Sequence, residues 1–163
     1  FRTLNAKDYQ RVVSNKHDQT ADNHWVIENQ GTINSQAAVR HTASGIAWKY
    51  APTSVNRSAL WPLESPIAHP AVAANALVTI NLWSRRTHTD IKGQLLIKGG
   101  CIAGVTADVT NDISVAADTW EELEITFTPT EAGVVEVYFK AWYEGGGTYT
   151  YSVFVDDFSV TQA

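Results

Sequence analysis

The sequence contains no methionine and a single cysteine, Cys101. One thiol has no partner within the chain, so an intrachain disulfide framework is excluded. No apolar run approaches the ~18 residues that a membrane-spanning helix needs, and no signal-peptide pattern opens the sequence. We therefore expect no membrane partner. Because the chain begins with Phe1 and has no initiator residue, we expect either a mature product or one module of a longer polypeptide, and part of a larger chain or oligomer.

Basic residues are also scarce in this sequence. The 12 Lys and Arg stand against 17 Asp and Glu, which gives a formal net charge of −5 at pH 7. The basic residues are scattered, so they form no positive stripe that could follow a phosphate backbone. We expect no nucleic-acid partner. A length of 163 residues suits one domain, whose core needs no metal or disulfide to fold.

The motifs of common catalytic sites are missing as well. No serine lies in a Gly-x-Ser-x-Gly turn, and the three glycines 145–147 are followed by Thr148 where a phosphate-binding loop needs lysine. Asp156 and Asp157 are adjacent, so in a regular strand they point to opposite faces and cannot act as a paired acid and base. Cys101 lies in an apolar setting and is expected to be an inert thiol. The histidines have no metal-ligand spacing: His17, His24, His41, His69 and His88. We therefore expect a protein that is not an enzyme.

Two parts of the chain differ in texture. Residues 1–36 are polar and irregular, which predicts an N-terminal arm or linker. Residues 37–163 consist of short stretches rich in Val, Ile, Thr and aromatic residues, separated by Gly, Pro, Asn and Asp. This pattern is typical of an all-β sandwich, and helical periodicity is hard to find.

The strands can be phased by their alternation of apolar and polar residues, since successive side chains of a strand point to opposite faces. Three strands, over residues 77–86, 120–128 and 134–144, each show one apolar face. The predicted core positions are Val78, Ile80, Leu82, Leu123, Ile125, Phe127, Val135, Val137, Phe139 and Ala141. A fourth strand, over residues 151–160, is apolar on both faces, which predicts an inner strand of a sheet.

The opposite faces of two of these strands carry the candidate binding residues. One set is Asn81, Trp83 and Arg85, and the other is Tyr138, Lys140 and Trp142. If both strands belong to one sheet, these side chains form a patch of aromatic rings flanked by hydrogen-bonding groups, which suits the faces and hydroxyls of sugars. The same residue types are enriched at protein interfaces, so the alternative is a surface covered by a loop or a neighbouring subunit.

The order of several segments resembles the carbohydrate-binding-module type of jelly roll over about residues 37–161. The similar segments are Ala37-Ala38-Val39-Arg40, Leu82-Trp83-Ser84-Arg85, Thr119-Trp120-Glu121-Glu122-Leu123-Glu124-Ile125-Thr126-Phe127-Thr128 and Val155-Asp156-Asp157-Phe158-Ser159-Val160. The resemblance implies a two-sheet antiparallel jelly-roll β-sandwich in which one sheet or a loop edge binds glycan. It also implies that a structural calcium ion is frequent, although we expect no other cofactor.

Two further comparisons follow from this resemblance. The segments 125–137 and 155–157 are also similar to modules in structural proteins of tailed bacteriophages. The acidic N-terminal stretch that helps to hold calcium in the family has only a poor match here, in residues 27–31. The sequence also has no clustered Asp/Asn loop of the kind that binds calcium, so we expect no tight metal site.

These observations lead to two hypotheses. In the first, the chain is a non-catalytic surface module of a phage-type virion or appendage, with a decoration, fibre or adhesin role. It would dock on other virion proteins through the arm and contact cell-surface glycans through its aromatic face. In the second, it is the carbohydrate-binding module of a secreted polysaccharide-degrading enzyme, with the parent polypeptide as its partner. The corresponding locations are the virion surface and the extracellular space.

Overall fold

The computed structural model describes residues 31–36, 38–42, 47–52, 58–62, 70–144 and 150–163. Within these ranges the regular elements are strands, and no helix there is long and apolar enough to cross a membrane. In chain order they are β1 (Gly31–Gln36), β2 (Ala47–Pro52), β3 (Ser58–Pro62), β4 (Ala71–Val72), β5 (Val78–Arg86), β6 (Ile91–Ile97), β7 (Val109–Asp112), β8 (Trp120–Phe127), β9 (Gly133–Val134), β10 (Val137–Tyr143) and β11 (Val153–Gln162).

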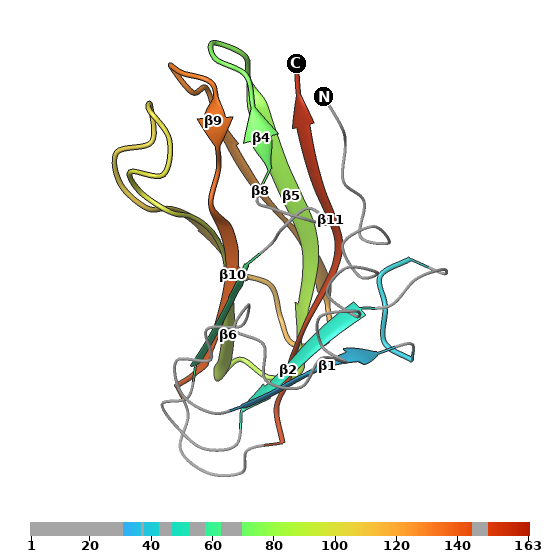
Figure 1. The fold of residues 1–163 in the computed structure, drawn as a ribbon. Helices are drawn as coiled ribbons and strands as arrows, with labels where there is room; N and C mark the ends of the chain where they lie inside the picture. Colours follow the sequence, from blue (N-terminus) through green and yellow to red (C-terminus); the bar gives the residue numbers. More distant parts are fainter. Residues whose placement is uncertain (1–30, 37, 43–46, 53–57, 63–69, 145–149) are drawn as a thin grey trace.

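Two sheets face each other and enclose the core (Figure 1). The five-stranded sheet has the order β1-β2-β11-β5-β8, and the four-stranded sheet has the order β3-β10-β6-β7. The neighbouring strands in both sheets run antiparallel, and a short β4–β9 pair adds a third, two-stranded sheet. The expected all-β sandwich is confirmed.

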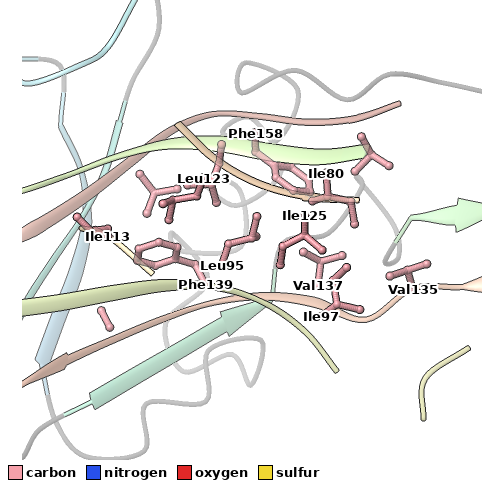
Figure 2. Packing of buried hydrophobic residues seen from close by; sticks show 14 of the residues in the cluster. Ile80, Leu95, Ile97, Ile113, Leu123, Ile125, Val135, Val137, Phe139 and Phe158 are labelled. Atoms are coloured by element: carbon pink, nitrogen blue, oxygen red, sulfur yellow. The ribbon is translucent and has the colours of Figure 1, made fainter. Parts of the chain in front are cut away.

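The core forms where the apolar faces of the two sheets meet. Along β5 every second residue from Val78 is buried, and the intervening residues are half-buried. Figure 2 shows Ile80 and Ile125 of the five-stranded sheet opposite Val137 and Phe139, which belong to β10 of the four-stranded sheet. The predicted core positions are confirmed: all are buried except Phe127, which is half-buried and packs against the cluster. Alternation therefore assigned the inward face of each strand correctly.

Strand β11 lies between β2 and β5, as expected for a strand that is apolar on both faces. Val153, Phe154 and Val155 are all buried. The register with β5 shifts between Asp156 and Ser159, and Asp157 has a φ of 50°. This irregularity is a β-bulge, and bulges re-aim side chains locally. Because of the bulge, both aspartates contact His41, although in a regular strand they would point to opposite faces.

The beginning of the sheet falls inside the range expected to be an arm. Strand β1, residues 31–36, pairs with β2 along its length. The rest of that range, residues 1–30, lies outside the described residues, as do the three glycines 145–147. Residues 63–69, which precede β4, also lie outside them.

Candidate functional site

The six predicted binding residues lie in two different sheets. Asn81, Trp83 and Arg85 belong to β5 in the five-stranded sheet, whereas Tyr138, Lys140 and Trp142 belong to β10 in the four-stranded sheet. Because the inner faces of both sheets form the core, their outer faces point away from each other. The six residues therefore do not form one patch, and the two sets are considered separately.

The aromatic ring of the β5 set is covered by another part of the chain. The His41 ring stacks on Trp83 with 3.9 Å between ring centroids and 10° between planes. The same imidazole meets the edge of Trp120 at 5.6 Å. A sugar ring would have to displace His41 to stack on that side of Trp83. The covered-surface alternative is thus the better description of this face.

Both aspartates of the β11 bulge hold His41 in place. The backbone N–H of His41 donates to Asp156 Oδ2 at 2.8 Å, and His41 Nδ1 lies 2.8 Å from Asp157 Oδ2. Asp156 Oδ1 accepts the N–H of Asp157 at 2.8 Å, and Thr42 Oγ1 lies 3.4 Å from Asp157 Oδ1. Protein donors thus point at the oxygens that a cation would need. Within the described part of the chain, these two carboxylates thus serve to fix His41 and the bulge.

The polar members of the β5 set are also engaged within the protein. Asn81 Nδ2 donates to Glu122 Oε1 at 2.8 Å, and Ser159 Oγ is hydrogen-bonded to Asn81 Oδ1. Arg85 Nη2 donates to Asp118 Oδ1 at 2.8 Å. These contacts link β5 to β8, to the turn that precedes β8 and to β11, so the set holds the sheet together.

The β10 set has a different environment. Its members lie on the outer face of the four-stranded sheet, each half-buried. Antiparallel pairing places Trp142 opposite Lys92, and Lys140 opposite Gln94, which in turn pairs with Asp112 of β7. Paired residues of neighbouring strands share a face. The outer surface therefore combines aromatic rings with amine, amide and carboxylate groups.

Local contacts orient these rings. The Tyr138 hydroxyl donates to Glu136 Oε2 at 2.8 Å, and Trp142 Nε1 donates to Glu144 Oε1 at 2.6 Å. Lys140 Nζ lies 5.5 Å from the Trp142 ring centroid, within cation–π range. The polar edges of both rings are fixed by carboxylates two residues away along the chain.

A cavity of about 410 Å³ opens beside Trp142. This volume lies in the range of about 300–1,000 Å³ that is usual for small-ligand sites. Its lining comes from both sheets: Arg86, Lys92, Gly93, Asp112, Ile113, Trp142 and Glu144. The aromatic face of β10 thus ends in a concave site with both cationic and anionic walls.

Sequence reasoning missed most of the residues that line this cavity. Lys92 and Asp112 were not singled out because their relation to Trp142 depends on the register between strands. Arg86 did carry a signal in the sequence. It has the same parity in β5 as Val78, Ile80 and Leu82, which places a charged residue on the core face. A cation on an apolar face is unusual and would have identified it.

Other chemistry-bearing groups give no site. Burial is the main cause that raises the pKa of the Cys101 thiol, and the Glu136 charge adds to it, so the thiolate that would act as a nucleophile is disfavoured. Among the residues that the structure describes, no group of three His, Cys, Asp or Glu could hold a metal ion.

Comparison with known proteins adds information about the fold. No protein-family model matches the chain, and no curated protein sequence matches it either. Solved structures do match. The CBM22-2 xylan-binding domain of Paenibacillus barcinonensis Xyn10C is 13% identical with a TM-score of 0.55, and the match covers 99% of both chains.

Two other similar structures come from different contexts. TmCBM61, solved in complex with β-1,4-galactotriose, is 13% identical with a TM-score of 0.53, over 90% of this chain and 93% of that one. The enzymatically active domain of tailspike protein 4 from bacteriophage CBA120 is 12% identical with a TM-score of 0.60; the match covers 86% of this chain and 19% of the tailspike chain. At these identities the likeness concerns the fold, which is that of carbohydrate-binding modules and of a phage tailspike segment.

Proposed function

We propose that this protein is a non-catalytic module that binds glycan through the outer face of its four-stranded sheet. The observation that carries the proposal is the pair of half-buried rings on β10, Tyr138 and Trp142, with Lys140 between them. The similarity of the fold to carbohydrate-binding modules supports it.

The chemistry of this face suits a sugar chain. Alternate residues of a strand repeat at about 6.6–6.8 Å along one face, so the three side chains form a row along β10. Apolar C–H faces of sugar rings can pack on the indole and phenol rings, while Lys92, Gln94 and Asp112 supply donors and acceptors for hydroxyl groups. Sites of this kind need no nucleophile, which agrees with the absence of a catalytic motif in the sequence.

Isothermal titration against a panel of polysaccharides tests the proposal. The panel should include xylan and β-1,4-galactan, the polymers related to the ligands named for similar structures, together with bacterial surface glycans. We expect Trp142→Ala to weaken binding by about tenfold or more, since a ring contact worth ~1.4 kcal/mol changes affinity by that factor. Tyr138→Ala should weaken it as well.

The opposite sheet provides the matched control. Trp83 also alternates outward, but it is stacked against His41 on the five-stranded sheet. We expect Trp83→Ala to leave glycan affinity unchanged in samples that thermal unfolding shows to be folded. Silence across the whole panel, or an equal loss of affinity in Trp83→Ala and Trp142→Ala, would contradict the proposal.

A second candidate is a surface module of a virion or appendage that docks on other structural proteins. The tailspike match favours it, because there the same fold occurs within a larger phage protein. Under this hypothesis the protein is located on the virion surface, whereas a module of a secreted enzyme is extracellular. Mass spectrometry and electron microscopy of purified particles test it, since absence of the polypeptide from virions would exclude this role.

A further inference from the structure

Arg86 occupies an unusual position for a cation. It is the last residue of β5 and is only 7% exposed, because its side chain follows the inward parity of Val78, Ile80 and Leu82. Burying a charged group is costly unless a counter-charge and hydrogen bonds compensate it. The partners of the Arg86 guanidinium therefore indicate whether this charge is satisfied within the protein.

The partners that the structure gives to Arg86 are neutral. Nη2 donates to the Val115 carbonyl oxygen at 2.7 Å and lies 3.5 Å from that of Ser114. Within the described ranges, Nε has no acceptor and no carboxylate forms an ion pair with the guanidinium. The Glu121 carboxylate binds the same segment, residues 114–115, by accepting hydrogen bonds from Ser114 and Val115. Among the described residues, the charge of Arg86 acts on Glu121 without an ion pair between them, so no carboxylate is bonded to the guanidinium.

This guanidinium, which forms no ion pair within the described ranges, lies in the wall of the 410 Å³ cavity beside Trp142. A second cation, Lys92, lines the same cavity and is only loosely paired, with Nζ 3.9 Å from Glu144 Oε2. Asp112, the other anion of the lining, accepts a hydrogen bond from Gln94 Nε2 at 2.6 Å. Both carboxylates of the wall therefore have donors already, whereas both cations can take a further acceptor.

We propose that the cavity binds the carboxylate of an acidic sugar residue, such as a uronate, with Arg86 as the anchoring cation and the Trp142 ring beside the sugar. This inference rests on the proposed glycan-binding function and deepens it. A planar guanidinium suits a carboxylate because the two groups can form paired, charge-assisted hydrogen bonds. The neighbouring aromatic ring favours a sugar acid over a small inorganic anion.

The recognition would differ from that of the flat row on β10. Tyr138 and Lys140 lie outside the cavity lining, so they contact the chain of the glycan, whereas Arg86 and Lys92 select the residue that enters the cavity. The protein would thus prefer a glycan with an acidic branch or an acidic end to its neutral counterpart.

Titration with two oligosaccharides that differ only in one carboxylate tests this inference. Suitable probes are a glucuronic acid-substituted xylo-oligosaccharide and the unsubstituted one, and an oligogalacturonate with a galacto-oligosaccharide of equal length. We expect the acidic member of a pair to bind about tenfold more tightly, as charge-assisted hydrogen bonds allow. The preference should decrease as salt concentration rises.

Variants then assign the preference to Arg86. Arg86→Met should abolish it, so that the acidic and the neutral oligosaccharide bind with equal affinity, while Arg86→Lys should retain only part of it. The matched control is Lys98→Met, which removes an exposed cation just beyond β6 that does not line the cavity. A preference that persists in Arg86→Met would overturn the inference. If that variant does not fold, NMR of the wild-type protein gives the test. The side-chain ¹⁵N signal of Arg86 should shift when glucuronate is added and not when glucose is added.

The possible results distinguish this inference from the proposed function. Equal binding of acidic and neutral oligosaccharides would refute the acidic-sugar site and leave the glycan-binding function standing. No binding of either would refute both. Comparable binding of acetate or of an acidic peptide would show that the cavity selects carboxylates on another kind of ligand, which also overturns the assignment to a sugar.

Discussion

Replacing His41 with alanine tests whether the outer face of β5 is a covered, structural surface. The change removes the ring that stacks on Trp83 at 3.9 Å and the contact of Nδ1 with Asp157 at 2.8 Å. It keeps the backbone N–H that donates to Asp156. Any loss of stability therefore comes from the imidazole alone.

The expected magnitude follows from these two contacts. An aromatic pair contributes about 0.5–1.5 kcal/mol, and a typical hydrogen bond makes a net contribution of about the same size. The side chains of His41 and Asp157 are each 26% exposed, so solvent screens their interaction and the lower part of both ranges applies. We expect His41→Ala to reduce the free energy of unfolding by about 1–2 kcal/mol, which for a chain of this size lowers Tm by ~3–6 °C.

Urea denaturation and thermal melts, each with glycan titration on the same samples, give the measurement. His41→Phe separates the contribution of the stack from that of the contact with Asp157, because a phenyl ring can stack on Trp83 but cannot bind Asp157. Its loss should be about half that of His41→Ala. Glycan affinity should stay unchanged in both variants, since β5 and β10 lie in different sheets.

Two results would refute this reasoning. A His41→Ala protein as stable as the wild type would mean that the stack contributes nothing to folding. A fall in glycan affinity, with stability retained, would mean that His41 and Trp83 belong to a binding surface after all.

Two further substitutions test the core and the turn near Arg86. A Cβ at Gly93 would lie 2.5 Å from Ile113 Cδ1, so Gly93→Ala should lower the free energy of unfolding by about 1–3 kcal/mol in urea denaturation, and a neutral effect would contradict the close packing of β6. Burial alone would raise the pKa of Glu121. This effect is outweighed by hydrogen bonds from Ser114 and from the Val115 N–H and by the charge of Arg86, so the pKa lies below its ordinary value. The lowered pKa means that ionised Glu121 stabilises the fold above the pKa of the unfolded chain, and this contribution is lost as pH falls through the folded value. Glu121→Gln should therefore be less stable than the wild type at pH 7 and show a flatter loss between about pH 5 and 2, whereas parallel pH profiles would count against the hydrogen bonds.

The strands and their inward faces could be predicted from local sequence. Alternation is a local property, because successive side chains of any strand point to opposite sides. It was enough to predict that Leu82 and Leu123 are buried and that β11 is an inner strand, and these predictions are confirmed. The same parity places Arg86 inward, although its importance depends on what it meets there.

Which strand faces lie together could not be predicted from the sequence. Whether two strands share a sheet depends on hydrogen bonds between residues far apart in the chain, and strand periodicity carries no information about them. The pairing of β10 with β6 therefore separates Trp142 from Trp83 and joins it to Lys92. In the same way, the bulge in β11 brings both aspartates to His41. The aromatic residues that the sequence grouped by their outward parity are thus divided between a covered surface on β5 and a candidate binding surface on β10.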